Sequence, residues 1–381
     1  MTLNDIPTPA YVLEEHLLRQ NLSLIRYVAD EAGVEIIMAF KAFALWKSFP
    51  IVREYISGCT ASSLSEAEMG NTYMQTLTHT YAPVYKPTEF GALMERSSHI
   101  TFNSLSQFER FYPEVKSYNG HDISCGLRIN PEYGEVETDL YNPASPASRL
   151  GVPVSKLPPR LPEGIEGLHF HTLCENDSHT LERTLAVVEE RFGKYLDQVK
   201  WLNMGGGHLM TSKDYDTGHL IALLRAFRER HPNLRIIMEP GAAFVWQTGV
   251  LVTEILDIVE NGGISTLMMD ASFTCHMPDT LEMPYQPRIR NAKSTPEAAY
   301  THGYRVGGNS CLSGDFIGDW FFKEEEQIGD RLIFEDMIHY TTVKTTMFNG
   351  VTHPSIWMHC TDDSWVCFRE YTPKDYLDRM C

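Results

Sequence analysis

The chain lacks the features that would direct it to a membrane or to nucleic acid. No apolar run approaches the roughly 20 residues that a membrane-spanning helix needs. The first residues, 1–5, carry neither the basic nor the apolar segment of a signal peptide. The net charge is −18, and this sign disfavours binding to a phosphate backbone. We therefore expect a cytoplasmic protein that binds no membrane and no nucleic acid.

Paired cysteines are also missing. The eight cysteines are scattered, and no two of them have the CxxC spacing that is typical of zinc sites and redox motifs. A disulfide framework is therefore disfavoured, and we expect no metal site. The acidic charge would concentrate a cationic substrate, although a solvated acidic surface is the more common meaning of such a charge.

What the chain does have is a long alternation of apolar runs and amphipathic stretches. Its 381 residues are enough for two domains, or for one barrel with an appendage. The alternation extends from about residue 14 to residue 240, and eight runs have the length of strands. These runs are 35–40, 58–62, 79–82, 99–102, 123–129, 165–172, 199–203 and 234–239.

Helical patterns separate most of these runs. Residues 63–66 (SLSE) and 104–107 (SLSQ) are typical of capping boxes at helix starts. The fifth connection is rich in proline between residues 143 and 162, so we expect no regular helix there. Eight repeats of this kind predict an α/β unit, a (β/α)8 TIM-like barrel over residues 14–244.

After residue 244 the pattern changes to strands. Runs at 250–256, 264–269, 332–334 and 356–359 have strand character, and helical periodicity is scarce. The short run 11–13 is a strand that could join them. We predict a C-terminal β-rich domain, a barrel or sandwich, over residues 245–381 together with residues 1–13.

Lys41 stands where the first barrel strand ends. The apolar run before it is typical of a strand buried on both faces, so the lysine would face the cavity half-desolvated. Burial disfavours the charged form of an amine, which suits Schiff-base chemistry. The alternative is a lysine that extends its stem along the surface and keeps its ammonium in water.

Three further features follow later barrel strands, at the end where function collects in such barrels. Gly205, Gly206 and Gly207 follow the seventh strand, and their amides could form a nest for a phosphate; a plain loop is the alternative. His169 and His171 share one face of the sixth strand, where a histidine is either catalytic or part of the core.

Glu239 ends the eighth strand. A carboxylate in a desolvated cavity needs a cation or a proton donor as partner. A protonated pyridine nitrogen is one such partner, and an arginine or Lys41 is another. Lysine, phosphate nest, carboxylate and a ring-sized cavity together fit pyridoxal 5'-phosphate, PLP.

With these residues the chain resembles the PLP decarboxylases of the alanine racemase fold (fold type III), which act on ornithine, diaminopimelate and related substrates. The carboxynorspermidine/carboxyspermidine branch is the most similar. The resemblance spans essentially the whole chain and rests on short phrases in a specific order. These phrases are AFKA at 39–42, LHFH at 168–171, MGGGH at 204–208, EPG at 239–241, SFTCHMPD at 272–279, NSCLSGD at 309–315, HYTT at 339–342 and FNG at 348–350.

The resemblance implies roles for residues in both domains. Lys41 would hold the cofactor as a Schiff base, and His171 would stack on its ring. Glu239 would pair with the ring nitrogen, and Gly205, Gly206, Gly207 and Tyr340 would hold the phosphate. Cys311 would enter from the partner subunit of a homodimer with shared active sites and return the proton after CO2 leaves.

The resemblance also implies how substrate binds. Asp279 would hold the distal amine, Asp270 and Asp315 are weaker candidates for this role, and Glu239 would lie beside the reacting end. Arg149 would face Asp315 across the dimer interface.

Two departures from the family pattern favour the carboxynorspermidine branch. Ala242 and Ala243 follow Glu239-Pro240-Gly241, where the wider family often has an arginine. Leu312 follows Cys311, where diaminopimelate decarboxylases have a glutamate. The implied function is therefore PLP-dependent decarboxylation of carboxynorspermidine or carboxyspermidine. The alternatives are a diaminopimelate or ornithine decarboxylase, and a non-catalytic regulator of polyamine enzymes.

Overall fold

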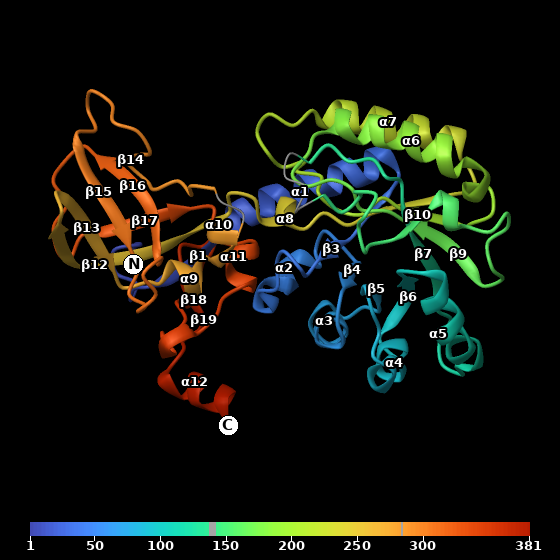
Figure 1. Ribbon diagram of the computed structural model, residues 1–381, viewed down its shortest axis with the longest axis horizontal. Coiled ribbons are helices and arrows are strands. Elements are labelled where there is room, and N and C mark those ends of the chain that lie inside the picture. The colour runs from blue at the N-terminus through green and yellow to red at the C-terminus, as the bar shows by residue number, and fades with distance from the viewer. Residues whose placement is uncertain (137–141, 283–284) are drawn as a thin grey trace. The chain divides into compact units, whose positions relative to one another are not determined.

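The computed structural model describes residues 1–136, 142–282 and 285–381. The chain divides into two compact units. One unit comprises residues 21–244, and the other joins residues 1–20 to residues 245–381. Each unit has a sheet of its own, and one sheet is parallel whereas the other is mostly antiparallel (Figure 1).

Residues 21–244 are built on a ten-stranded parallel sheet that closes on itself. The first run supplies two short pieces, β2 and β3. β2 pairs with β11 and β3 pairs with β4, so this run joins the two ends of the sheet into a barrel. The strands are β2 (Glu35–Ile36), β3 (Met38–Ala39), β4 (Cys59–Ala61), β5 (Thr78–Tyr81), β6 (Ser97–Phe102), β7 (Ser124–Asn130), β8 (Val152–Pro153), β9 (Ile165–His169), β10 (Trp201–Asn203) and β11 (Arg235–Met238).

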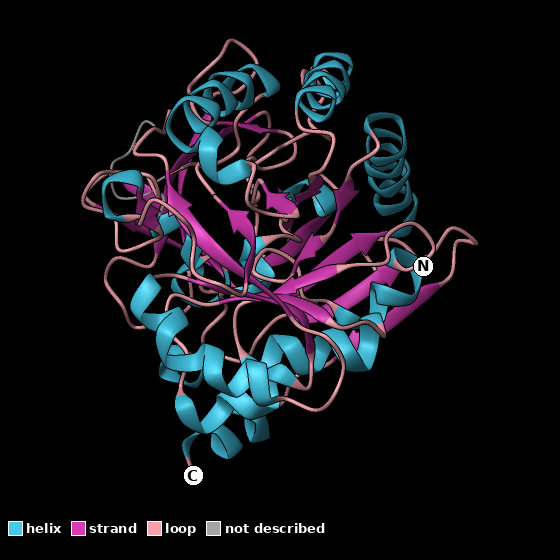
Figure 2. Cartoon of the chain, turned by 90° about the vertical axis from the view of Figure 1, so that its right-hand side faces the viewer, coloured by secondary structure: helices cyan, strands magenta, loops and turns pink. Residues whose placement is uncertain are grey.

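Helices follow most barrel strands and lie outside them (Figure 2). Their apolar faces cover the barrel; in α6, for example, Leu181, Leu185 and Val188 are buried. The helices are α1 (Glu15–Ala32), α2 (Phe49–Val52), α3 (Leu64–Met69), α4 (Pro87–Met94), α5 (Leu105–Ser117), α6 (Ser178–Leu196), α7 (Thr217–Arg230) and α8 (Ala242–Val245).

Both predicted helix starts are confirmed with their serine N-caps, although the side chain of the third helical residue accepts the amide before the N-cap and not that of the N-cap itself. The Ser63 hydroxyl accepts the Glu66 amide of α3 at 3.2 Å, and the Glu66 side chain accepts the Ser62 amide at 2.6 Å. Gln107 makes the same pair of bonds at the start of α5. The proline-rich fifth connection contains β8 and one 3-10 turn, Val154–Lys156, and no α-helix in its described part.

The second unit contains a nine-stranded, mostly antiparallel sheet. The predicted strand near residue 11 is part of it, because β1 lies between β12 and β18. The strands are β1 (Ala10–Glu14), β12 (Gly249–Asn261), β13 (Ile264–Met269), β14 (Ala292–Lys293), β15 (His302–Gly307), β16 (Phe316–Phe322), β17 (Arg331–Glu335), β18 (Ser355–His359) and β19 (Trp365–Arg369).

Short helices interrupt the second sheet: α9 (Phe273–His276), α10 (Pro278–Glu282), α11 (Tyr340–Val343) and α12 (Pro373–Met380). The two sheets confirm the predicted fold class, a parallel barrel and a β-rich unit. None of the helices in the described residues is both long and apolar enough to span a bilayer.

Candidate active site

Lys41 follows β3 by two residues. The chain turns there, because the Ala42 amide donates to the Ala39 carbonyl at 3.2 Å and the Phe43 amide donates to the Phe40 carbonyl at 3.1 Å. The lysine side chain is exposed, whereas Phe40 and Ala42 are buried. The expectation of a half-buried lysine is therefore wrong. The predicted position of Lys41 after the carboxyl end of the first strand is confirmed.

Glu239 and Asn203 lie at the same end of the barrel, one just after β11 and the other at the end of β10. Asn203 Nδ2 donates to Glu239 Oε1 at 2.6 Å, and Asn203 Oδ1 accepts the Gly205 amide at 2.9 Å. Burial raises the pKa of the Glu239 carboxyl, and the Asn203 hydrogen bond and the charges of Lys41 and Arg128 oppose that rise. The hydrogen bond from Asn203 therefore holds the carboxyl in place, and a further cation beside it would lower its pKa.

The glycine loop after β10 tolerates no side chain. A Cβ on Gly206 would lie 2.4 Å from the Glu239 carbonyl oxygen. Gly205 and Gly207 have φ of +67° and +89°, which favours glycine, and a Cβ on Gly207 would lie 2.1 Å from the Leu173 carbonyl oxygen. The loop therefore packs directly against the strand ends that carry Glu239 and the histidines.

Two histidines, His169 at the end of β9 and His171 two residues later, differ in burial. His171 Nδ1 accepts the Gly206 amide at 3.0 Å, so that nitrogen carries no proton. Burial and the charge of Lys41 hold the His171 pKa well below its usual value. His169 is buried, and its Nε2 lies 3.7 Å from Glu239 Oε2. A neutral, half-buried imidazole such as His171 suits stacking on an aromatic ring.

Sequence reasoning missed a buried arginine at this mouth. The Arg128 guanidinium of β7 lies over the Tyr81 ring, 4.8 Å from its centroid, and donates to the His171 carbonyl at 3.2 Å. Tyr81 in turn contacts the His169 ring, with centroids 5.3 Å apart. The signal was available, because Arg128 is a lone charged residue near the end of an apolar run, and a buried charge requires a partner.

In the second unit, Cys311 lies on the loop between β15 and β16. Its thiol side chain is exposed, while its amide donates to Asn349 Oδ1 at 2.9 Å. Asp315 braces the same loop: one oxygen accepts the Thr274 amide at 2.9 Å, and the other accepts the Ser310 amide and hydroxyl at 3.1 and 2.6 Å. The loop is thus held rigidly with its cysteine presented outward.

Asp279 lies in α10, beside α11, which begins at Tyr340. Its side chain is buried, and Oδ2 accepts the Tyr285 hydroxyl at 3.0 Å and the Thr341 hydroxyl at 3.3 Å. Oδ1 is buried and has no hydrogen-bond partner among the described residues. A buried carboxylate oxygen in this condition is suited to a cation supplied from outside the protein. Tyr340 itself is half-buried.

The barrel mouth fits a planar, protonated ring with a phosphate. Glu239 has a raised pKa and lacks a full countercharge, and both ring nitrogens of His169 are buried without a hydrogen bond among the described residues. The glycine loop lies directly against Glu239 and His171, and glycine is required because any Cβ there would collide with backbone. A buried carboxylate of this kind is the partner that a pyridinium nitrogen requires.

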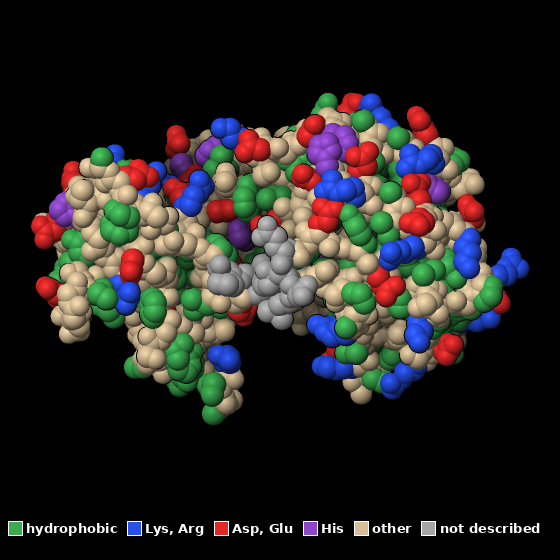
Figure 3. All heavy atoms as spheres, turned by 45° about the horizontal axis from the view of Figure 1, so that its top comes forward, with side chains coloured by type: hydrophobic (Ala, Val, Ile, Leu, Met, Phe, Trp, Pro, Cys, Tyr) green, Lys and Arg blue, Asp and Glu red, His purple; other side chains and the backbone are tan. Residues whose placement is uncertain are grey.

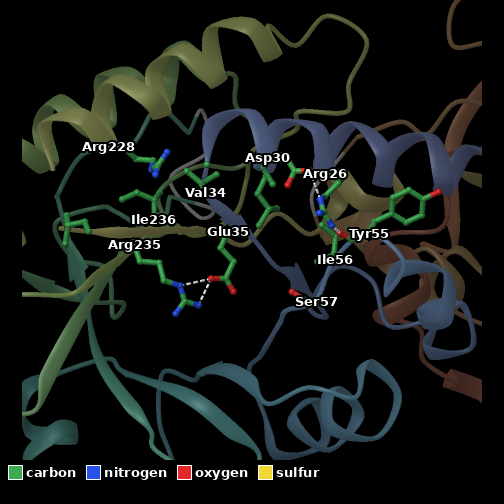
Figure 4. A pocket seen from close by; sticks show the side chains of 14 residues that line it. Arg26, Asp30, Val34, Glu35, Tyr55, Ile56, Ser57, Arg228, Arg235 and Ile236 are labelled. Carbon is green, nitrogen blue, oxygen red and sulfur yellow. Dashed lines mark hydrogen bonds and ion pairs between the residues drawn. The ribbon is translucent and has the colours of Figure 1, made fainter. Parts of the chain in front are cut away.

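A cavity of about 520 Å³ lies at the other end of the barrel strands. It opens beside the first residues of β2 and β11 (Figure 4), whereas Lys41 and Glu239 follow the last residues of β3 and β11. The three guanidinium groups that line it are already bonded, Arg26 and Arg235 to carboxylates and Arg228 to a helix carbonyl. In a barrel this face serves stability, so we do not assign the reaction to it.

A lysine, a glycine loop and a carboxylate at the mouth of a parallel barrel define the class of barrel-type PLP enzymes. The family model described as pyridoxal-dependent decarboxylase, C-terminal sheet domain, matches residues 12–338. The chain belongs to this family of PLP-dependent decarboxylases.

Two relatives match the chain along its whole length. A carboxyaminopropylagmatine decarboxylase from Synechocystis sp. is 48% identical, over 99% of this chain and 96% of the relative. A carboxynorspermidine/carboxyspermidine decarboxylase from Campylobacter jejuni is 40% identical, over 99% of each.

Solved structures agree with these relatives. The crystal structure of carboxynorspermidine decarboxylase from C. jejuni, complexed with norspermidine, has a TM-score of 0.91 at 40% identity and covers 98% of this chain and 100% of that one. A diaminopimelate decarboxylase has a TM-score of 0.81 at 20% identity, covering 98% of this chain and 93% of its own, and shows the shared fold.

Proposed function

We propose that the protein decarboxylates carboxynorspermidine, carboxyspermidine or both, releasing norspermidine or spermidine. The observation that carries the proposal is the unbroken likeness, over both units, to the C. jejuni enzyme whose crystal structure holds norspermidine. The free, buried oxygen of Asp279 supports a substrate with a cationic far end. Leu312, after Cys311, disfavours diaminopimelate, because a leucine cannot bind a second amino-acid head.

A second candidate substrate is carboxyaminopropylagmatine. It is favoured by the 48% identity to the Synechocystis relative. The molecule would present a guanidinium where the triamines present an ammonium, and both are cations that a carboxylate accepts. Asp279 offers one open oxygen, whereas a two-pronged contact with a guanidinium needs two. That geometry favours the ammonium of the triamines.

The residues of the barrel mouth would hold PLP. Lys41 would bond to its aldehyde carbon, His171 would stack on the ring, and Glu239 would face the ring nitrogen. The phosphate would lie at Gly205–Gly207, with Tyr340 beside it. When bound, PLP supplies an electron sink for the electron pair of the bond that breaks when CO2 leaves.

Each side chain then has a task that its contacts support. Asn203 orients the Glu239 carboxylate, which would keep a proton on the ring nitrogen of bound PLP. The neutral His171 ring adds no charge beside a cationic ring. Cys311 Sγ, on a loop held by the bond from its amide to Asn349, would return a proton to the carbon that lost CO2. Asp279 holds the distal cation and so fixes which bond lies at the reacting position.

Asp279 is a better candidate for the distal cation than the other two aspartates. Asp315 already accepts three hydrogen bonds within its own loop. Asp270 Oδ1 accepts the Glu254 amide of β12 at 3.0 Å, so this carboxylate already has a structural role in the second sheet. Asp279 keeps one buried oxygen unbonded among the described residues.

We propose further that the enzyme is a cytoplasmic homodimer with shared active sites. Residues 14–244 would bind the cofactor, and residues 245–381 with 1–13 would present Cys311 to the partner. Leu312, Phe316 and Phe348 are exposed around the cysteine loop, at 44%, 40% and 47%, as expected of side chains that a second copy covers. All eight cysteines are free, which suits a reducing compartment.

The test is CO2 release by the PLP-loaded enzyme from a panel of substrates. The panel contains carboxynorspermidine, carboxyspermidine, carboxyaminopropylagmatine, diaminopimelate and ornithine. We expect kcat/KM to be highest for a carboxylated triamine, and the two triamines to differ by about 10- to 200-fold at most, since they differ by one methylene. A higher kcat/KM for diaminopimelate or ornithine would contradict the proposal. No CO2 from any substrate would identify a non-catalytic relative.

A further inference from the structure

Two helices on the outside of the barrel bring three metal-binding side chains together. α6 and α7 pack side by side (Figure 1). His179 is in the first turn of α6, Glu182 lies one turn later on the same face, and His219 is in the first turn of α7. One ligand atom from each of the three lies within 4.8 Å of the others. All three are outside the site described above.

The distances within this cluster match a shared ion. Glu182 Oε2 lies 3.4 Å from His219 Nε2 and 3.9 Å from His179 Nδ1. Imidazole and carboxylate bind zinc at about 2.0–2.2 Å with tetrahedral geometry, which sets neighbouring ligand atoms roughly 3.3–3.5 Å apart. The two imidazole rings stack with centroids 4.0 Å apart, and because an ion lies in the plane of each ring that binds it, the exposed His179 ring must turn out of the stack to bind.

The buried Ser178 contacts the other nitrogen of the His219 ring, the one that does not face the carboxylate. The Ser178 hydroxyl donates to the Asp216 carbonyl at 3.3 Å and lies 2.9 Å from His219 Nδ1. When the hydroxyl keeps its proton on the Asp216 carbonyl, Ser178 accepts from Nδ1–H. In that tautomer Nε2 presents its lone pair to the Glu182 carboxylate 3.4 Å away, and two such acceptors are suited to share a cation, either a proton or a metal ion.

We propose that His179, Glu182 and His219 form a binding site for one divalent transition-metal ion of the zinc class, with a fourth position open to water. The surrounding charges permit it. The helix N-termini are positive, but their caps, Asp177 and Asp216, offset that potential. Figure 3 shows histidine side chains gathered at the surface of one face, where an ion can enter from solvent.

The position of the ion gives it a mechanical role. α6 and α7 follow loops 170–177 and 204–216, which carry His171 and the glycine loop. These loops are already joined, because the Asn176 amide donates to the Gly207 carbonyl at 3.0 Å. An ion between the helix ends would brace both loops from behind. This inference departs from the expectation of no metal, which rested on cysteine spacing and could not foresee ligands from two helices.

Zinc binding to the PLP-loaded enzyme tests the site. After treatment with EDTA, wild type, Glu182→Gln, His219→Gln and the control His302→Gln are dialysed against zinc chloride, and bound zinc is counted. His302 is an exposed histidine on β15, so its replacement removes an imidazole without touching the cluster. We expect wild type and control to bind one zinc ion per chain more than Glu182→Gln or His219→Gln. Zinc held by the exposed thiols of Cys311 and Cys381 would be equal in all four proteins.

Equal zinc counts in all proteins would overturn the proposal, and the cluster would then be an ordinary histidine–glutamate ion pair. Melting temperatures measured in EDTA check that the variants fold. If His219→Gln melts early, His179→Gln replaces it, because that side chain is 51% exposed. Zinc should also slow hydrogen exchange of residues 204–216 in wild type and not in Glu182→Gln. Exchange that slows equally in both proteins would contradict the bracing role.

Discussion

Asn203 connects the Glu239 carboxylate to the glycine loop. Its Nδ2 donates to Glu239 Oε1 at 2.6 Å, and its Oδ1 accepts the Gly205 amide at 2.9 Å. One amide side chain therefore fixes the group that would face the ring nitrogen and the loop that would face the phosphate. Its two hydrogen bonds have opposite polarity, so neither aspartate nor leucine can replace it.

Asn203→Asp should weaken both PLP affinity and turnover. The change replaces a donor by a carboxylate beside Glu239, and a lost charge-assisted hydrogen bond costs about 1.5–3 kcal/mol. We expect kcat/KM to fall about 10- to 100-fold, since each 1.4 kcal/mol is tenfold. Glu239→Gln should keep the fold and lose rate similarly.

Asn71→Asp is the control for these two variants, because Asn71 also bridges loops, donating to three backbone carbonyls. It should lower the melting temperature without changing PLP affinity. An unchanged turnover number in Glu239→Gln would show that Glu239 is not the partner of the ring nitrogen.

Asp279→Asn should raise the KM for a carboxylated triamine and leave PLP affinity unchanged. The substitution keeps the shape of the side chain and removes the charge that a distal ammonium would meet. We expect KM to rise about tenfold or more, the loss of one charge-assisted hydrogen bond of about 1.5–3 kcal/mol. Asp270→Asn is the comparison, and a larger KM effect there would reassign the role.

Mixed dimers should recover activity if the sites are shared. Lys41→Ala and Cys311→Ala homodimers should each be nearly inactive. After mixing and subunit exchange, about half of the dimers are mixed, and each has one intact site, so activity should approach roughly a quarter of wild type. No recovery, with exchange verified by mass spectrometry, would mean that Cys311 serves its own barrel.

The barrel interior should make stability sensitive to acid. His99 stacks on His79 with ring centroids 3.8 Å apart, and burial lowers the pKa of His99 to about 4. Between pH 6.5 and 4 the unfolded chain takes up a proton at His99 and the folded chain does not. The contribution of His99 to the free energy of unfolding is therefore complete above pH 6.5. It falls on acidification, by at most about 1.4 kcal/mol per pH unit.

His99→Gln should reduce the fall in melting temperature between pH 7 and pH 5. His302→Gln, at an exposed position, is the control and should leave that fall unchanged. Equal pH dependence in wild type and His99→Gln would show that other groups control acid stability.

The barrel could be predicted from sequence because its strands are buried on both faces. Such strands appear as uninterrupted apolar runs, and the run before Lys41 is an example. The second sheet was harder to predict: β15 and β16 each begin with exposed residues, and β12 continues five residues beyond its predicted end, through the exposed Asp257 and Glu260. Strands such as these, which expose part of one face to solvent, have no continuous apolar signal.

The same physics limited the prediction of the site. Lys41, Glu239 and the glycine loop could be placed at one mouth because the carboxyl ends of parallel strands meet there. The Arg128–Tyr81 contact and the role of Asn203 depend on which side chains meet across strands, and no local pattern encodes that pairing.

The central claim is that PLP is bound covalently at Lys41, and peptide mapping after borohydride reduction tests it most directly. The holoenzyme is reduced, digested and analysed by mass spectrometry, with Lys47→Ala as a control for a neighbouring lysine. We expect the reduced cofactor on the peptide that contains Lys41 in wild type and in Lys47→Ala, and no label in Lys41→Ala. A label on any other lysine, or a Lys41→Ala protein that is still labelled, would contradict the account.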